Sequence, residues 1–162
     1  MELLGLYDEK GNFLNKSIER GKKFDEDFIM ISMGVLKNDK DEYFIQKTSE
    51  EKGSLYSLTG GHVLYKETPL EAMIRETKEE LGIDIKKGSI KKIALEKHPK
   101  GPVLVNLFEI SINCDINNLK LQKEEVESAH FYTKDKVLDL INNNLFHPTH
   151  SYFFKKYFDK ER

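Results

Sequence analysis

The sequence predicts a mixed α/β (α+β) fold, in which strands and helices share one hydrophobic core. Three observations lead to this fold class. Segments with strand character dominate the first half of the chain, and a well-capped helix follows them. Further strands then alternate with helical segments. The length of 162 residues suits one domain over residues 1–162, because two domains would each bury little apolar surface.

The first half of the chain contains five segments that favour strands. Each is rich in aliphatic, aromatic or β-branched residues, and turn-forming residues bound it. A turn at Asn38–Asp41 predicts that the third and fourth segments form a hairpin, and the Gly60–Gly61 pair interrupts the last segment. The expected strands are Leu3–Tyr7, Phe13–Ile18, Phe28–Leu36, Tyr43–Lys47 and Leu55–Leu64.

The helix with the clearest boundaries begins at Pro69 and ends at Leu81. Thr68 is a favourable N-cap, and Glu71 completes a T-x-x-E capping box with it. Proline suits the first helical position because its fixed φ is already helical. Gly82 supplies a stop signal at the other end.

The second half of the chain continues with strands and ends with helices. Thr133 caps a helix over Lys134–Asn142, and a short aromatic helix over Ser151–Phe158 is expected to pack on the outside of the domain. The expected strands are Ile90–Leu95, Val103–Ile112 and Ala129–Tyr132.

Composition and charge exclude several classes of protein. The chain has 26 basic and 28 acidic residues, so its net charge of −2 gives no strong signal for nucleic-acid binding. The single cysteine, Cys114, excludes an intramolecular disulfide and a cysteine-cluster zinc site. No apolar run reaches the roughly 18–20 residues that cross a bilayer, and the N-terminus does not resemble a secretory signal. We therefore expect a cytoplasmic protein that does not enter membranes.

The predicted helix at residues 69–81 has one apolar face and one acidic edge when it is drawn at about 100° per residue. Glu76 and Glu80 border the apolar face, and Glu79 and Arg75 continue around the back. The apolar face comprises Leu70, Met73, Ile74, Thr77 and Leu81.

This acidic edge is unfavourable for an isolated helix. Glu76 and Glu80 form a like-charge i,i+4 pair. Glu79 and Glu80 also stand in the last turn, where the helix dipole disfavours each anion by about 0.3–1 kcal/mol. A solvated acidic face is the ordinary explanation for such glutamates. A divalent cation would offset both costs, because Mg²⁺ prefers oxygen ligands and usually binds beside substrate phosphates.

The spacing around this edge favours the metal-binding explanation. Gly61 is followed by five residues and Glu67, and then by seven residues and the run R-E-T-K-E-E-L-G-I, which begins at Arg75. The stretch Gly61–Ile83 resembles the Nudix box, G-x5-E-x7-R-E-U-x-E-E-x-G-U, in which U is a bulky aliphatic residue. Every fixed position matches. The one departure is Thr77 at an aliphatic position, where its methyl group can still pack on the buried face.

The resemblance implies the Nudix fold, a mixed β-sheet sandwiched between helices. It also implies a Mg²⁺-dependent hydrolase, with Mn²⁺ as an alternative metal. Such an enzyme cleaves the diphosphate linkage of a nucleoside diphosphate joined to another moiety, by water attack at phosphorus. Over residues 1–145 the chain looks like the branch that includes isopentenyl-diphosphate-isomerase-like Nudix proteins. The resemblance leaves open the substrate, the number of metal ions and the oligomeric state, although many relatives form homodimers.

The same resemblance assigns roles to individual residues of the box. Glu76, Glu79 and Glu80 supply the carboxylates that hold the metal, and the backbone carbonyl of Gly60 is a further ligand. Arg75 is expected to orient Glu79 through an ion pair. The general base is either Glu79 or Glu76, acting through a bound water, or a carboxylate from a loop.

Other residues complete the expected site. Gly61, Glu67 and Gly82 are structural residues of the box, and Glu67 ties the loop to the helix. Many Nudix proteins carry an additional metal-binding or basic glutamate in a loop after the box, and Glu125 is the candidate here; an acidic run on the surface is the alternative. His62 and His98 are candidates for substrate binding. A structural role for the first and an exposed loop for the second are the alternatives.

Two other functions are consistent with this family resemblance. One is an isomerase acting on an allylic diphosphate, but such enzymes need an acid/base cysteine near the first sheet, whereas Cys114 lies beyond the box. The other is a ligand-sensing module without catalysis. Such modules commonly lose the carboxylates of the box, and this chain retains them.

Overall fold

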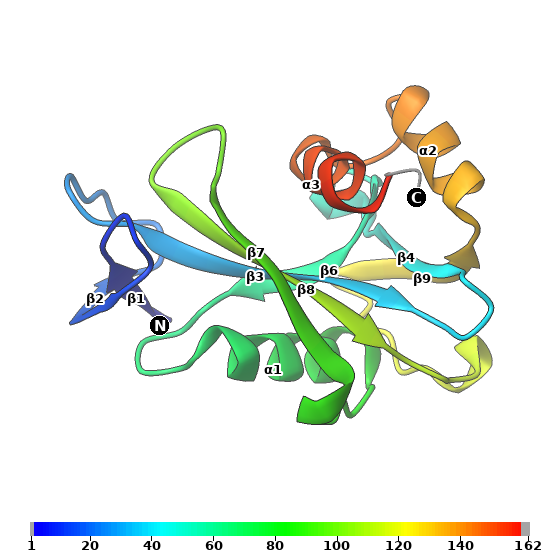
Figure 1. The fold of residues 1–162 in the computed structure, drawn as a ribbon, viewed down its shortest axis with the longest axis horizontal. Helices are drawn as coiled ribbons and strands as arrows, with labels where there is room; N and C mark the ends of the chain where they lie inside the picture. The colour runs from blue at the N-terminus through cyan, green and yellow to red at the C-terminus, as the bar shows by residue number, and fades with distance from the viewer. Residues whose placement is uncertain (1, 160–162) are drawn as a thin grey trace.

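A mixed sheet lies at the centre of the molecule, between helices on its two faces (Figure 1). The computed structural model describes residues 2–159, so the domain expected over 1–162 extends beyond the described range at both ends. Helix α1 (Pro69–Leu81) covers one face of the sheet. Helices α2 (Lys134–Asn142) and α3 (Pro148–Phe158) cover the other face. The predicted α+β fold with its sheet between helices is confirmed.

The central sheet has seven strands and combines parallel with antiparallel pairing. Its strand order is β5-β4-β3-β8-β7, with β6 paired to β3 and β9 paired to β4. Only β3 and β8 are parallel, in a register that runs from Ile29 opposite Val103 to Lys37 opposite Ser111. The strands are β3 (Ile29–Lys37), β4 (Tyr43–Thr48), β5 (Tyr56–Ser57), β6 (Thr59–His62), β7 (Ile90–Lys97), β8 (Val103–Ser111) and β9 (Val126–Tyr132).

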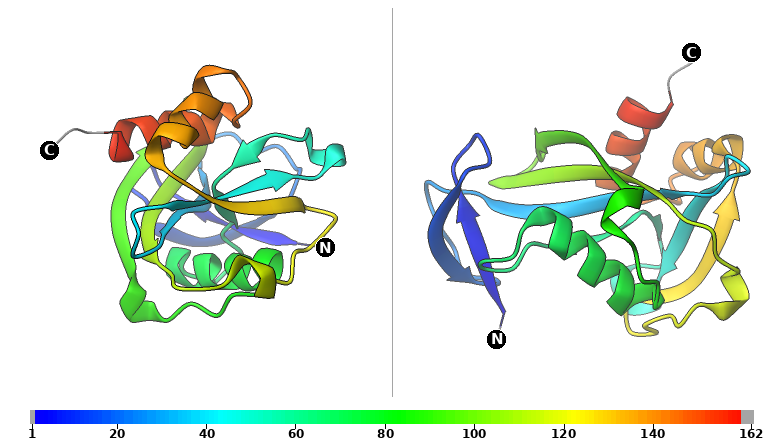
Figure 2. Two further views of the ribbon diagram at one scale, coloured as in Figure 1. Left: turned by 90° about the vertical axis from the view of Figure 1, so that its right-hand side faces the viewer. Right: turned by 60° about the horizontal axis from the view of Figure 1, so that its bottom comes forward.

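A separate two-stranded sheet stands at one end of the central sheet (Figure 2). It is an antiparallel hairpin of β1 (Leu3–Tyr7) and β2 (Phe13–Glu19). Single bridges join Leu4 to Leu64 and Tyr7 to Phe28, so the hairpin is anchored both to the segment before α1 and to the start of β3.

The expected hairpin of β3 and β4 forms only at its tip. Leu36 pairs with Phe44 and Lys37 with Tyr43, and the strands then separate. They separate because β3 continues between β6 and β8, whereas β4 pairs with β5 and β9. Two of these competing partners, β8 and β9, come from distant parts of the chain, so a local turn signal could not reveal them.

The Gly60–Gly61 pair does not interrupt a strand, contrary to expectation. Both glycines lie inside β6, where Gly60 pairs with Met33 and Gly61 with Ser32 of β3. An added Cβ at Gly60 would lie 2.3 Å from the carbonyl oxygen of Ser32, so glycine allows a close approach of two backbones here.

The expectation that the last helix packs on the outside was wrong. Helix α3 begins at Pro148, three residues before the expected start, and Phe153 and Phe154 are fully buried. Both phenylalanines belong to a core cluster with Val137 and Leu140 of α2 and with inward-facing residues of the sheet. A second cluster, which includes Met73 and Leu81, fills the space between the sheet and α1.

No helix within residues 2–159 has the length and apolar character needed to cross a membrane.

Candidate active site

Helix α1 presents the acidic edge, and local signals fix its position. The Thr68 hydroxyl accepts a hydrogen bond from the Glu71 backbone N–H at 3.1 Å, and the Glu71 carboxylate accepts one from the Thr68 N–H at 2.9 Å. Gly82 ends the helix with φ of 72°. This is the capping box and C-terminal stop that the sequence predicted.

Thr77, the departure from the box pattern, is buried on the inner face of α1. Its hydroxyl donates a hydrogen bond to the carbonyl oxygen of Met73 at 2.8 Å, so the polar atom is satisfied within the helix. The methyl group can therefore occupy the aliphatic position without leaving an unpaired hydroxyl.

Arg75 is the centre of an ion-pair network along the edge. Its guanidinium binds both carboxylate oxygens of Glu67, with distances of 2.7 Å from Nε and 3.0 Å from Nη2. Nη1 also donates to Glu76 at 2.8 Å and to Glu79 at 3.2 Å. The expected pair with Glu79 is present, but the two-pronged contact with Glu67 is shorter. These hydrogen bonds, led by those to Glu67, raise the pKa of Arg75 above its ordinary value.

Glu67 ties the loop to the helix, as its place in the sequence suggested. Besides Arg75, its carboxylate accepts a hydrogen bond from the Leu64 backbone N–H at 3.1 Å. Arg75 also donates to the backbone carbonyl of His62 at 3.0 Å. The loop between β6 and α1 is therefore held at both ends by a single arginine.

Glu80 is buried much more deeply than its position on the helical wheel indicated, with 7% of its surface exposed. Gln46 of β4 donates a hydrogen bond to it at 3.2 Å. Burial and the negative charge of Glu76 raise the pKa of Glu80, and burial likewise raises that of Glu76. Sequence reasoning missed Gln46; the only signal was a polar residue directly after the apolar run Tyr43–Ile45 of β4.

The loop that precedes β9 brings Glu125 towards this edge. The backbone N–H of Gln122 donates to the carbonyl of Glu80 at 2.9 Å, which holds the loop against the end of α1. The charge of Glu125 contributes to the raised pKa of Glu80, and its carboxylate lies 3.5 Å from the ammonium group of Lys52. The structure thus brings the loop glutamate and the glutamates of the box to one side of the molecule.

Gly61 leaves space that a glutamate of the box occupies. A Cβ added at Gly61 would lie 2.4 Å from the carboxyl carbon of Glu76. Any side chain at Gly61 would therefore displace that carboxylate, which gives this glycine a structural role beside the acidic edge. The neighbouring carbonyl of Gly60 as a metal ligand stays a prediction.

In the described residues, the side chains of the two candidate histidines form no hydrogen bond with the carboxylates of the acidic edge. His62 is mostly buried, and burial together with the nearby charge of Arg20 lowers its pKa. His98 bonds through Nε2 to the Thr149 hydroxyl at 3.0 Å, and its Nδ1 accepts from the Lys100 backbone N–H. Their roles in substrate binding stay predictions.

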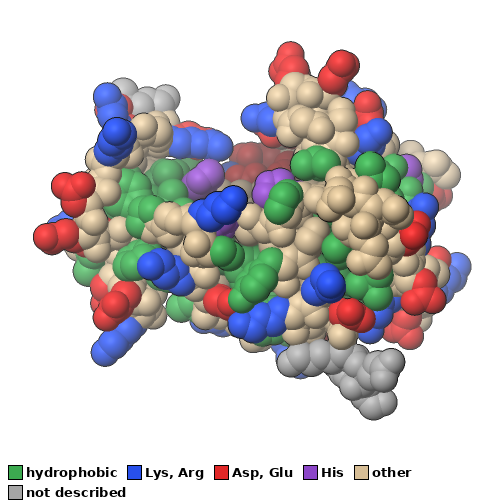
Figure 3. Space-filling model, turned by 90° about the horizontal axis from the view of Figure 1, so that it is seen from above, with side chains coloured by type: hydrophobic (Ala, Val, Ile, Leu, Met, Phe, Trp, Pro, Cys, Tyr) green, Lys and Arg blue, Asp and Glu red, His purple; other side chains and the backbone are tan. Residues whose placement is uncertain are grey.

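The donor set of the edge suits a hard divalent cation, because it consists of carboxylate oxygens that share a partly buried region. Within residues 2–159, no three His, Cys, Asp or Glu side chains already stand in a metal-binding arrangement. Contacts with Arg75 and Gln46 hold the glutamates instead. Figure 3 shows acidic side chains at the floor of a hollow, with histidine and basic side chains near its rim.

Comparisons with known proteins agree with the box motif. The NUDIX domain family model matches residues 30–157. An uncharacterized Nudix hydrolase of Listeria monocytogenes is 30% identical over 159 residues, which covers 95% of this chain and 91% of the relative. The NAD-capped RNA hydrolase NUDT12 of Pongo abelii is 24% identical over 113 residues, which is 69% of this chain and 23% of that longer relative.

A solved structure extends the likeness to the whole fold. The crystal structure of DR0079 from Deinococcus radiodurans has a TM-score of 0.78 and 19% sequence identity, and the match covers 97% of this chain and 99% of that chain. The family model spans most of this chain, and the Listeria relative matches it over nearly its full length. The protein therefore belongs to the Nudix hydrolase family.

Proposed function

We propose that this protein is a Mg²⁺-dependent hydrolase that cleaves the diphosphate linkage of a nucleoside diphosphate joined to another moiety, by water attack at phosphorus. One observation carries the proposal: Glu80 and Glu76 are held together in a partly buried region, where burial raises the pKa of both carboxyl groups and the charge of Glu76 raises that of Glu80 further. Such a pair favours a bound cation. Nudix hydrolases in general act on nucleoside diphosphate derivatives and use divalent metal ions.

The residues that would hold the metal are Glu76, Glu79 and Glu80, with Glu125 and the carbonyl of Gly60 as further ligands. When bound, the metal would neutralise phosphate oxygens and lower the pKa of a water molecule. Mn²⁺ offers similar chemistry with the same oxygen donors.

The protein's own side chains would orient the reaction. Arg75 holds Glu76 and Glu79 in position through its ion pairs. Glu79 is the most exposed carboxylate of the three, with 52% of its side chain accessible, so it can reach a water molecule from the solvent. We therefore assign the general base to Glu79, or to Glu76, acting through that water. Glu125 is the loop alternative.

The isomerase alternative has little support from Cys114. The thiol is partly buried beside the core cluster under α1, and burial raises its pKa. A sensing module remains the other alternative. Four other expectations also stay predictions. They are the likeness to the isopentenyl-diphosphate-isomerase branch, the cytoplasmic location, a homodimer, and the substrate roles of His62 and His98.

A phosphate-release assay with Mg²⁺ over a panel of nucleoside diphosphate derivatives tests the proposal. Glu79→Gln and Glu80→Gln keep the size of each side chain but remove its charge. We expect each to lower kcat by at least about 100-fold, the scale of losing a general base or a key electrostatic contact.

The matched control is Glu71→Gln on the same helix. Glutamine can take the place of glutamate in a capping box, so this variant should keep wild-type turnover. Near-normal turnover in both Glu79→Gln and Glu80→Gln would refute the metal-site assignment. A folded wild-type protein that turns over no member of the panel would favour the sensing module.

A further inference from the structure

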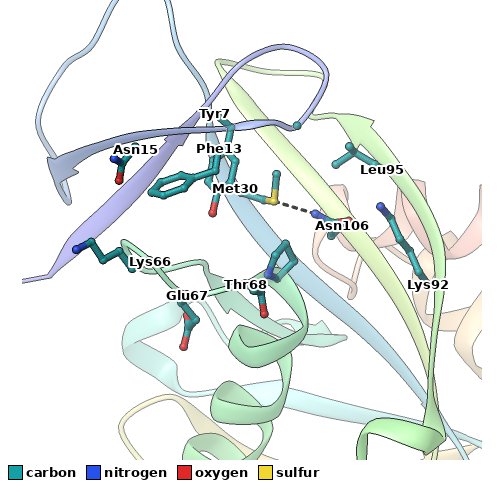
Figure 4. Close-up of a pocket in the computed structure, with 12 residues that line it drawn as sticks. Tyr7, Phe13, Asn15, Met30, Lys66, Glu67, Thr68, Lys92, Leu95 and Asn106 are labelled. Atoms are coloured by element: carbon teal, nitrogen blue, oxygen red, sulfur yellow. Dashed lines mark hydrogen bonds between the residues drawn. The ribbon is translucent and has the colours of Figure 1, made fainter.

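A cavity of about 510 Å³ lies between the β1–β2 hairpin, the first turn of α1 and the strands β3, β7 and β8 (Figure 4). Its volume is in the range of sites for small molecules. Glu67 lines the cavity, but its carboxylate is turned to Arg75 and belongs to the acidic edge. The hairpin that forms one wall lies outside residues 30–157, the part of the chain that the family model matches.

Aromatic and aliphatic side chains form the walls of this cavity. Phe13 is 41% exposed, although it is a large hydrophobic residue, and its ring lies 5.6 Å from that of Tyr7. Met30 and Leu95 line the inner and opposite sides. A flat ring bound against Phe13 would cover apolar surface that now faces solvent, so the walls favour an aromatic or heteroaromatic ligand.

Asn106 supplies a polar group inside the cavity. It projects from β8 towards the cavity, and only 3% of its surface is exposed. Its amide nitrogen donates to the sulfur of Met30 at 2.8 Å, which is a weak acceptor. Within residues 2–159, its carbonyl oxygen accepts no hydrogen bond. A buried carboxamide with an unused acceptor matches the donor and acceptor edge of a nucleobase.

Two lysines give the cavity a positive charge. Lys66 and Lys92 line it, and neither forms an ion pair with an acidic side chain in the described part of the chain. Lys66 also has a positive φ of 67°, a conformation that lysine rarely adopts. The carboxylate of Glu67 is paired with Arg75, which also contacts Glu76 and Glu79. The cavity therefore favours an anionic group, such as a phosphate, beside the lysines.

We propose that this cavity is a second ligand site that binds a nucleoside monophosphate. The base stacks on Phe13 and bonds to the carboxamide of Asn106, and the phosphate lies beside Lys66 and Lys92. The site is distinct from the acidic edge of α1, and it requires neither metal nor turnover.

Calorimetric titration with AMP, GMP, CMP and UMP, in the presence of EDTA, tests the proposal. We expect at least one of them to bind the wild-type protein with a Kd of about 1 mM or tighter. The matching nucleoside and inorganic phosphate should each bind at least about tenfold more weakly, since each offers half of the contacts. The double variant Lys66→Gln/Lys92→Gln should raise the Kd by about tenfold or more. Asn106→Leu should also raise it.

Lys91→Gln is the matched control, because this neighbouring lysine of β7 is exposed and does not line the cavity. Its Kd should stay within about twofold of the wild-type value. The proposal is overturned if none of the four nucleotides binds, if inorganic phosphate binds equally well, or if the double lysine variant binds like Lys91→Gln. Glu80→Gln should bind normally here even though it loses turnover. Loss of binding in Glu80→Gln alone would place the nucleotide at the acidic edge and overturn the second site.

Discussion

Individual side chains of the acidic edge are positioned by one arginine. The flat guanidinium of Arg75 meets Glu67 with two hydrogen bonds and still reaches Glu76 and Glu79. A lysine could not replace it, because an ammonium group lacks this fork of donors. The positions of these glutamates therefore depend on a basic residue.

His150 is a second residue whose environment defines its state. Its Nδ1 accepts a hydrogen bond from the Leu58 backbone N–H at 2.9 Å, and its ring lies 4.4 Å from that of His147. Burial, with smaller contributions from His147 and His98, lowers the pKa of His150 to about 3. The folded protein thus keeps this imidazole neutral at pH values where the unfolded chain protonates it.

This difference predicts a dependence of stability on pH. Between the unfolded pKa of 6.5 and the folded pKa of about 3, the unfolded chain binds the additional proton, so the free energy of unfolding must fall as the pH falls. We expect His150→Asn, which keeps an acceptor near Leu58 but does not titrate, to lose less stability than the wild type. Urea unfolding at about pH 7.5 and about pH 5 measures the difference. An equal loss in both proteins would contradict the assignment.

Among the elements, α3 contributes more to the core than its sequence suggested. Phe153 and Phe154 are neighbours in the chain, yet both are buried, because α3 packs against both the sheet and α2. Tyr152 and Tyr157 of α3 hold the helix to β7, where the carboxylate of Glu96 accepts hydrogen bonds from both hydroxyls.

We predict that Phe153→Ala lowers the free energy of unfolding by about 3–5 kcal/mol, because it leaves a cavity in the core. Lys155→Ala in the same helix is the control, since its side chain is exposed, and it should change stability by less than about 0.5 kcal/mol. Chemical unfolding of the three proteins measures both values. A small effect of Phe153→Ala, similar to that of the control, would show that α3 is not part of the folding core.

At the scale of the whole molecule, the acidic edge depends on the tertiary fold, because segments from different parts of the chain bond to one another there. Glu80 of α1 bonds to Gln46 of β4, and the loop before β9 bonds to the end of α1. Three segments that are distant in sequence therefore meet where negative charge accumulates. A cation bound here would stabilise the folded state, because the unfolded chain does not assemble this site.

We predict that Mg²⁺ raises the Tm of the wild-type protein by several degrees when its concentration is far above its Kd. At 100 times Kd, the stabilisation is about 2.7 kcal/mol. Glu80→Gln should be as stable as the wild type or slightly more stable without metal, because a like-charge pair is removed. It should gain much less from Mg²⁺. Thermal melts of both proteins in EDTA and in Mg²⁺ measure these differences, and an equal gain in both would remove Glu80 from the metal site.

The sequence alone determined the boundaries of α1 and the order of its functional residues. Thr68, Glu71 and Gly82 act within a few residues of their own positions, so their effects can be read without knowledge of the fold. The fixed spacing from Gly61 to Ile83 likewise identified the family before any contact was known.

Only the tertiary structure decided which partners these residues meet. The parallel pairing of β3 with β8, the bond between Gln46 and Glu80, and the burial of Phe153 all join segments that are far apart in the chain. A local pattern reports which face of an element is apolar, but it does not report what covers that face. For that reason the sequence placed Glu80 at the margin of the apolar face, and the packing of β4 and the loop before β9 against α1 made it a buried carboxylate.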